Sequence, residues 1–309
     1  MINGRALVLG VASSALLATG AFATGLSVNV GVIDILANEY VWEGDWKLSQ
    51  LIWETRAPVV TFGLAFSVNR FTVDADLSIA FLGDSHMEDY DWLQPYVVAN
   101  GPDDWTDQSI HPDTNLTRYL RAGIAVGFDV VSRDGLYVNL NGGFRYTDVI
   151  WDAFGGSYIY SNSGFRDIVG DFADGDPAIR YRQQWPVAFA GVDLQAMHGS
   201  WTFAATLQGG VTIGAIATDN HWWRDLRFVD TLFQAPVIHV GLRVENAISD
   251  HFSIFVEGAF DKIFEARADT NWFAISTGNP QGGCLDCAGA GFRSFSVAIG
   301  LSLALGGAH

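Results

Sequence analysis

Apolar and polar residues alternate along much of the chain. The clearest case is residues 71–81, where every second residue is mostly large and apolar while Asp74 and Asp76 occupy intervening positions. Because successive side chains of a strand point to opposite faces, this pattern predicts a strand with one apolar and one polar face. The same alternation recurs in residues 116–129, 201–212 and 294–305.

Weaker alternation marks six further segments, so the sequence predicts about ten strands. These segments are residues 27–35, 47–67, 136–151, 179–194, 236–249 and 252–264. Helical periodicity is not convincing anywhere after the first 23 residues, which favours an all-β fold.

The connections between these segments alternate in length. Short connections separate some neighbours, whereas long polar ones follow Phe81, Trp151, Ala215 and Phe264, and another covers residues 36–46. Outer-membrane barrels combine short periplasmic turns with long extracellular loops. We therefore predict a ten-stranded antiparallel transmembrane β-barrel with long extracellular loops, its large apolar side chains facing lipid. A soluble β-sandwich, which also alternates, is the alternative.

The first 23 residues have the order of a secretory signal peptide. Arg5 precedes an apolar run from Ala6 to about Leu17, and residues 21–23 (Ala-Phe-Ala) fit the usual cleavage site. The run is too short to cross a bilayer as a helix. The expected organisation is a signal peptide at 1–23 followed by one barrel domain at 24–309.

Charge and cysteine usage narrow the possible partners. The formal net charge is −17, which disfavours nucleic acid and favours ligands with cationic side chains. Cys284 and Cys287 form a C-x-x-C motif without a second ligand pair. In an exported chain this motif favours a small loop disulfide or two free thiols over a zinc or redox site.

Two acidic stretches could carry chemistry. Asp89 and Asp91 stand two residues apart, and crowded carboxylates can share a proton and donate it to a developing oxyanion. Asp219 and His221 have the same spacing, which places both on one face of an extended segment, where the carboxylate can orient the imidazole. The common motifs of zinc proteases, serine hydrolases and phosphate-binding loops are absent from the sequence.

Several longer segments of the sequence resemble the omptin family of outer-membrane proteases. They are KLSQLIW (47–53), HMEDYDWL (86–93), WTDQSIHPDTNL (105–116), GGSYIYSNSGFRDIVGDF (155–172) and TDNHWW (218–223). The resemblance covers about residues 27–305 and implies a narrow ten-stranded barrel with a peptide-binding groove at its extracellular end. It implies that Asp219 and His221 activate a water, while Asp89 and Asp91 hold that water and the reacting carbonyl.

The resemblance also implies substrate-binding residues. Ser109 and His111 match positions near the groove, and Glu39 matches an acidic residue at the base of the pocket for a lysine or arginine side chain. The family's second pocket carboxylate falls on Ala217, which is a departure from the pattern and leaves one charge where the family has two.

A second departure concerns lipopolysaccharide, which the family uses as an activator bound to the outer barrel face. The corresponding strand has Phe144, Tyr146 and Asp148, where the family pattern has an arginine at the last position. Arg180 and Arg182 on the neighbouring strand could compensate, and on that ground lipopolysaccharide is an expected activator and partner. The chemistry itself requires no cofactor.

The combined hypothesis is an endopeptidase of the bacterial outer membrane whose active site faces outward and cleaves peptides or exposed protein segments near basic residues. The rival is a non-catalytic adhesin or receptor barrel whose acidic mouth binds cationic ligands. A general porin is disfavoured because about ten strands leave a lumen largely filled by side chains.

Overall fold

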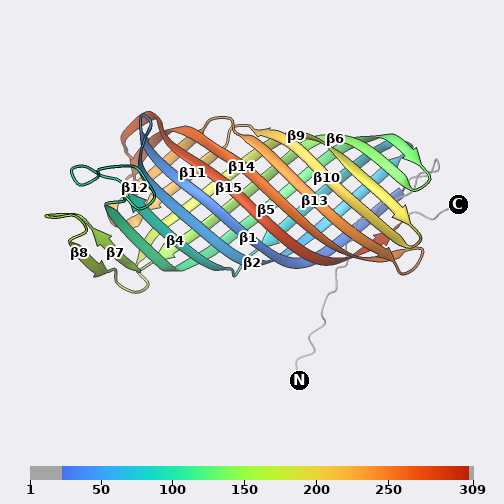
Figure 1. Ribbon diagram of the computed structural model, residues 1–309, viewed down its shortest axis with the longest axis horizontal. Helices are drawn as coiled ribbons and strands as arrows, with labels where there is room; N and C mark the ends of the chain where they lie inside the picture. The colour runs from blue at the N-terminus through green and yellow to red at the C-terminus, as the bar shows by residue number, and fades with distance from the viewer. Residues whose placement is uncertain (1–22, 306–309) are drawn as a thin grey trace, which may run out of the picture.

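The alternating segments form strands that are paired antiparallel throughout, as the computed structural model of residues 23–305 shows (Figure 1). Residues 1–22 and 306–309 lie outside the described residues, and with them nearly all of the expected signal peptide. The strands are β1 (Ala23–Glu43), β2 (Trp46–Val68), β3 (Phe71–Ala80), β4 (Asp84–Asp91), β5 (Asp107–Arg133), β6 (Leu136–Phe154), β7 (Ser157–Tyr160), β8 (Ile168–Asp171), β9 (Pro177–His198), β10 (Trp201–Thr212), β11 (Ile216–His221), β12 (Leu226–Leu232), β13 (Pro236–Ala247), β14 (Phe252–Ala274) and β15 (Pro280–Ala304).

These segments close into a barrel with ten strand positions. Strands β3 and β4 share the position between β2 and β5, β10 and β11 share the position beside β9, and β12 and β13 share the position beside β14. Pairing of β15 with β1 completes the ring, while the β7–β8 hairpin extends from β5 outside it. The predicted ten-stranded antiparallel barrel is confirmed.

The strands are much longer than a membrane requires. Crossing a bilayer takes about 9–11 residues of a tilted strand, whereas β5 has 27 residues and β15 has 25. The prediction of long loops after Phe81, Ala215 and Phe264 was therefore wrong in detail. Most of those residues continue the barrel wall as β4, β11, β12 and the end of β14, and the residues after Trp151 add three more residues to β6.

Burial confirms which face of each strand points outward. Phe71 is 60% exposed and Ile299 59%, whereas Ser302 is 1% exposed and Ser78 is buried. Leu116 is an exception: it was expected to face lipid but lies in the buried interior. The register of β5 against β6 shifts between Leu116 and Arg118, and such a bulge reverses the faces of the residues that precede it.

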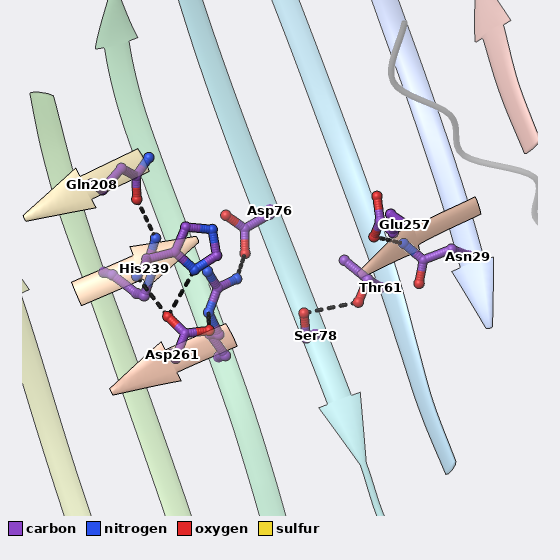
Figure 2. A network of polar contacts seen from close by, with 10 residues as sticks. Asn29, Thr61, Asp76, Ser78, Gln208, His239, Glu257 and Asp261 are labelled. Atoms are coloured by element: carbon purple, nitrogen blue, oxygen red, sulfur yellow. Dashed lines mark hydrogen bonds and ion pairs between the residues drawn. The ribbon is translucent and has the colours of Figure 1, made fainter. Parts of the chain in front are cut away.

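Charged side chains cross the lumen of the barrel (Figure 2). Arg145 of β6 donates to Asp261 of β14 at 2.9 Å, and His239 Nδ1 lies 2.9 Å from the same carboxylate. Arg121 pairs with Asp76 at 2.6 Å. The Arg145–Asp261 contact joins strands that are not neighbours in the ring, so charged side chains occupy part of the middle of the barrel.

One covalent cross-link lies in β15. Cys284 and Cys287 form a disulfide, which agrees with the first of the two alternatives drawn from the sequence. The glycine-rich stretch around them was expected to be a turn but is part of the strand. Among residues 23–305 no helix is long and apolar enough to cross a membrane.

Candidate active site

The four predicted catalytic residues lie at the end of the barrel opposite the C-terminus, where β4, β11 and β12 extend the wall (Figure 1). Asp89 and Asp91 belong to β4, and Asp219 and His221 belong to β11. Because each pair occupies alternate positions of a strand, both side chains of the pair point to the same face, and Asp219 is buried there.

Asp219 and His221 contact each other directly. His221 Nε2 lies 2.5 Å from Asp219 Oδ2, with 2% of the Asp219 side chain and 17% of the His221 side chain exposed. A carboxylate that accepts a hydrogen bond from Nε2 fixes the tautomer of the histidine ring and leaves Nδ1 as the basic nitrogen. The pair can therefore accept a proton from water and hold the resulting imidazolium.

Asp89 and Asp91 are placed to share a proton. Burial raises the pKa of Asp89 well above its usual value, and the neighbouring charge of Asp91 raises it further. Burial also raises the pKa of Asp91 to about 6, against the lowering effect of a hydrogen bond from Ser49. Ser49 Oγ donates to Asp89 Oδ1 at 3.2 Å. One of the two carboxyls can thus be neutral near neutral pH and serve as a donor.

The two pairs act on each other across the interior. The charge of Asp219 raises the pKa of Asp89, and His221 lowers that of Asp91. Strands β5, β6 and β9 separate β4 from β11 around the ring, so the pairs come from different sides of the barrel. The structure brings together the four residues that the sequence predicted.

Ser109 and His111 line the wall beside these pairs. Ser109 is opposite Asp89 in the β4–β5 register, and its Oγ lies 3.0 Å from His111 Nε2. His111 stacks on Phe172 with ring centroids 5.5 Å apart, and Trp223, two residues after His221, lies 6.4 Å away. Burial lowers the pKa of His111, which favours a neutral ring.

Glu39 lies near the candidate catalytic carboxylates. It occupies the buried face of β1 and is 4% exposed. Burial raises its pKa well above the usual value, and the charges of Asp219, Asp230 and Asp89 add to the effect. A protonated Glu39 can donate a hydrogen bond to Asp219.

Asp230 is a buried acid that the sequence did not single out. It lies on β12 directly opposite Ala217 of β11 and is 3% exposed. Burial raises its pKa to about 7, and Asp219 contributes to the rise. Residues 216–232 had been read as a loop. Asp230 is two residues before the buried Leu232, and residues two apart in a strand share a face, so this spacing could have placed the acid on the inner face.

Aromatic rings form a layer next to the acidic residues. Trp53 stacks on Tyr181 at a centroid distance of 5.4 Å and lies 5.8 Å from Trp151. All three side chains are fully buried, and Tyr181 is opposite Asp219 in the β9–β11 register. This layer keeps the dielectric low around the carboxylates, which strengthens their mutual effects.

The arginines expected to bind lipopolysaccharide are already paired. Arg180 contacts Asp152 through two hydrogen bonds of 2.6 and 2.8 Å, and Arg182 contacts Asp148 at 2.7 and 2.9 Å. Arg118 adds a third donor to Asp148 at 2.9 Å. A lipid phosphate at this face would have to compete with these carboxylates, and lipopolysaccharide binding stays a prediction.

Comparisons with known proteins agree with the barrel fold. The Omptin family model matches residues 21–305. The plasminogen activator of Yersinia pestis is 24% identical over 89% of this chain and 88% of its own, and the outer membrane protease IcsP of Shigella flexneri is 26% identical over 84% and 82%. The crystal structure of the outer membrane protease OmpT of Escherichia coli superposes with a TM-score of 0.83 at 20% identity, covering 93% of this chain and 99% of the other. The chain belongs to the omptin family of outer-membrane proteases.

Proposed function

We propose that the protein is an endopeptidase in which Asp219 and His221 activate a water molecule opposite the Asp89–Asp91 pair. The observation that supports this most directly is the contact of 2.5 Å between His221 Nε2 and the buried Asp219, on the side of the interior opposite two carboxyls that can retain a proton. A receptor that only bound cationic ligands would need the acidic residues but not the imidazole.

Each step of peptide hydrolysis can then be assigned to a residue of the candidate site. His221 removes a proton from the water as its oxygen bonds to the peptide carbonyl carbon, and Asp219 stabilises the imidazolium. The protonated member of the Asp89–Asp91 pair donates a hydrogen bond to the oxyanion. When the C–N bond breaks, His221 returns its proton to the leaving amine. The water molecule supplies the hydroxyl of the new carboxyl group and the proton of the new amine, so no covalent enzyme intermediate is needed.

The preferred substrates would carry a lysine or arginine near the cleaved bond. Glu39 is a buried carboxylate beside the dyad, and a desolvated carboxylate binds a cationic side chain through strong charge-assisted hydrogen bonds. The net charge of −17 would also attract cationic peptides. Ser109 and His111 would contact the peptide beside the reacting carbonyl. The mouth would face the extracellular side, where such peptides arrive.

Cleavage of a peptide library by the refolded protein and its His221→Ala variant tests this proposal. We expect the variant to lose a factor of about 10² or more in turnover, because general-base assistance contributes that much. His251→Ala is the matched control, since His251 is exposed in the turn between β13 and β14 at the other end of the barrel. Heat-modifiable gel mobility reports folding. Equal turnover in folded wild type and His221→Ala would exclude the dyad.

A further inference from the structure

Two buried acids beside the candidate catalytic residues each have one carboxylate oxygen without a hydrogen-bond partner. Glu39 Oε2 and Asp230 Oδ1 are inaccessible to solvent and have no hydrogen-bond partner within the part of the chain that the structure describes. A buried oxygen without a donor is costly because its desolvation is not offset, and the hydrogen bond of Asp230 with Thr270 leaves Asp230 Oδ1 unpaired. Such a pair is therefore suited to a ligand that brings donors or positive charge.

The wall between these two acids is made of small side chains. Glu39 on β1 and Asp230 on β12 are separated around the ring by β15 and β14. The inward residues of those strands near the acids include buried alanines and Thr270, which is opposite Asp230, and Ala217 stands opposite Asp230 on the other side. The buried alanines are Ala266, Ala268, Ala288 and Ala290.

We propose that Asp230 is a specificity-determining residue that, together with Glu39, binds the lysine or arginine side chain of the substrate. The assignment rests on the proposed function and deepens it. The two carboxylates approach from different strands, so they can accept from different donors of one guanidinium or ammonium group. The upward pKa shifts of both groups agree with this, because a bound cation is what would make ionisation favourable.

The alternative role for Asp230 is to tune the dyad. Asp219 and Asp230 influence each other electrostatically, so loss of Asp230 could alter the basicity of His221. That effect would change cleavage of every substrate by the same factor and would shift the pH profile of turnover. A pocket role would change only substrates that carry the cation.

The test compares specificity constants for two matched peptides, with arginine or norleucine before the cleaved bond. Asp230→Asn should lower the arginine-to-norleucine ratio about tenfold to a hundredfold, the range expected for losing a hydrogen bond between charged groups. Glu39→Gln should lower the same ratio. Asp113→Asn, which removes an exposed acid of β5, should leave it unchanged.

A second variant moves the carboxylate across the strand pair. Cross-strand neighbours have Cβ atoms about 4.5–5.5 Å apart, so Asp230→Ala combined with Ala217→Asp offers a carboxylate from the opposite strand. We expect this double variant to regain much of the arginine preference that Asp230→Ala alone loses. Cleavage of the norleucine peptide by each single variant would show that it is folded.

Three results would overturn the assignment. One is an arginine preference that Asp230→Asn leaves intact in an active protein. The second is an equal loss for both peptides with a shifted pH profile, which would make Asp230 a positioning residue for the dyad. The third is a folded wild type that cleaves neither peptide, which would remove the proposed function itself and the pocket with it.

Discussion

Replacing Asp219 by asparagine should reduce turnover strongly and leave the barrel at least as stable as the wild type. Asparagine keeps an oxygen that can accept from His221 but loses the charge that stabilises the imidazolium. A hydrogen bond to a charged group contributes about 1.5–3 kcal/mol, and general-base assistance about 10²–10⁴ in rate. We expect a fall in turnover by a factor of about 10² or more.

The stability effect has the opposite sign because Asp219 repels its neighbours. Its charge raises the pKa of Glu39, Asp89 and Asp230. Removing it relieves this like-charge repulsion, and asparagine keeps an oxygen that can accept from His221, so the free energy of unfolding should not fall. Residues arranged for catalysis commonly lower stability in this way.

The assays are turnover of a fluorogenic peptide and a urea unfolding titration in lipid vesicles. Asp261→Asn is the matched control, because Asp261 balances Arg145 and His239 in the lumen, and removing one partner of a buried ion pair costs about 3–5 kcal/mol. Its folded fraction should keep turnover while its stability falls. An Asp219→Asn variant that is fully active, or that unfolds as readily as Asp261→Asn, would refute the reasoning.

Two further predictions concern the membrane segment and pH. Leu77→Arg, on the outward face of β3, should weaken refolding into lipid by about 2–4 kcal/mol if the position is near the bilayer midplane. Ser78→Ala, on the lumen face of the same strand, removes one hydrogen bond with Thr61 and should be milder. The reverse order in refolding titrations would overturn the assignment of faces. Burial raises the pKa of Asp91 to about 6 and that of Asp230 to about 7. Acids whose folded pKa is raised contribute stability that is complete below the unfolded pKa near 4 and is lost as pH rises through the folded value. The free energy of unfolding should therefore fall between about pH 4 and pH 7, and Asp230→Asn should flatten that slope; a slope of opposite sign would contradict the assignment.

Alternation predicted the strands well where lipid surrounds the barrel. There the outward face must be apolar, as Phe71 and Ile299 are, while small or polar residues such as Ser302 point inward, so the period of two is plain in the sequence. Above the membrane both faces meet water or other protein, and that requirement disappears. Strands β4, β11 and β12 consequently do not separate apolar from polar residues between their two faces, and their sequences predicted loops.

Two features of the site could not be read from spacing. The bulge near Leu116 inserts one residue into β5 and reverses the faces of what precedes it, and nothing in the local composition marks it. Asp230 was missed for a different reason, since its importance depends on pairing with Ala217, a contact that exists only once β11 and β12 are known to be adjacent. The roles of Asp89, Asp91, Asp219 and His221 came from family resemblance. Their spacing alone is common in loops.

Some buried acids of the barrel have basic partners and others do not. In the lumen Asp76 contacts Arg121 and Asp261 contacts Arg145. Beside the candidate catalytic residues, burial raises the pKa of both Glu39 and Asp230 and neighbouring carboxylates add to the rise, while a hydrogen bond with Thr270 lowers the pKa of Asp230. A cationic substrate side chain would supply there the counter-charge that arginines supply below. Under the proposed function, binding of a cationic side chain therefore offsets the unfavourable burial of Glu39 and Asp230. The same two acids that lower stability favour cationic substrates.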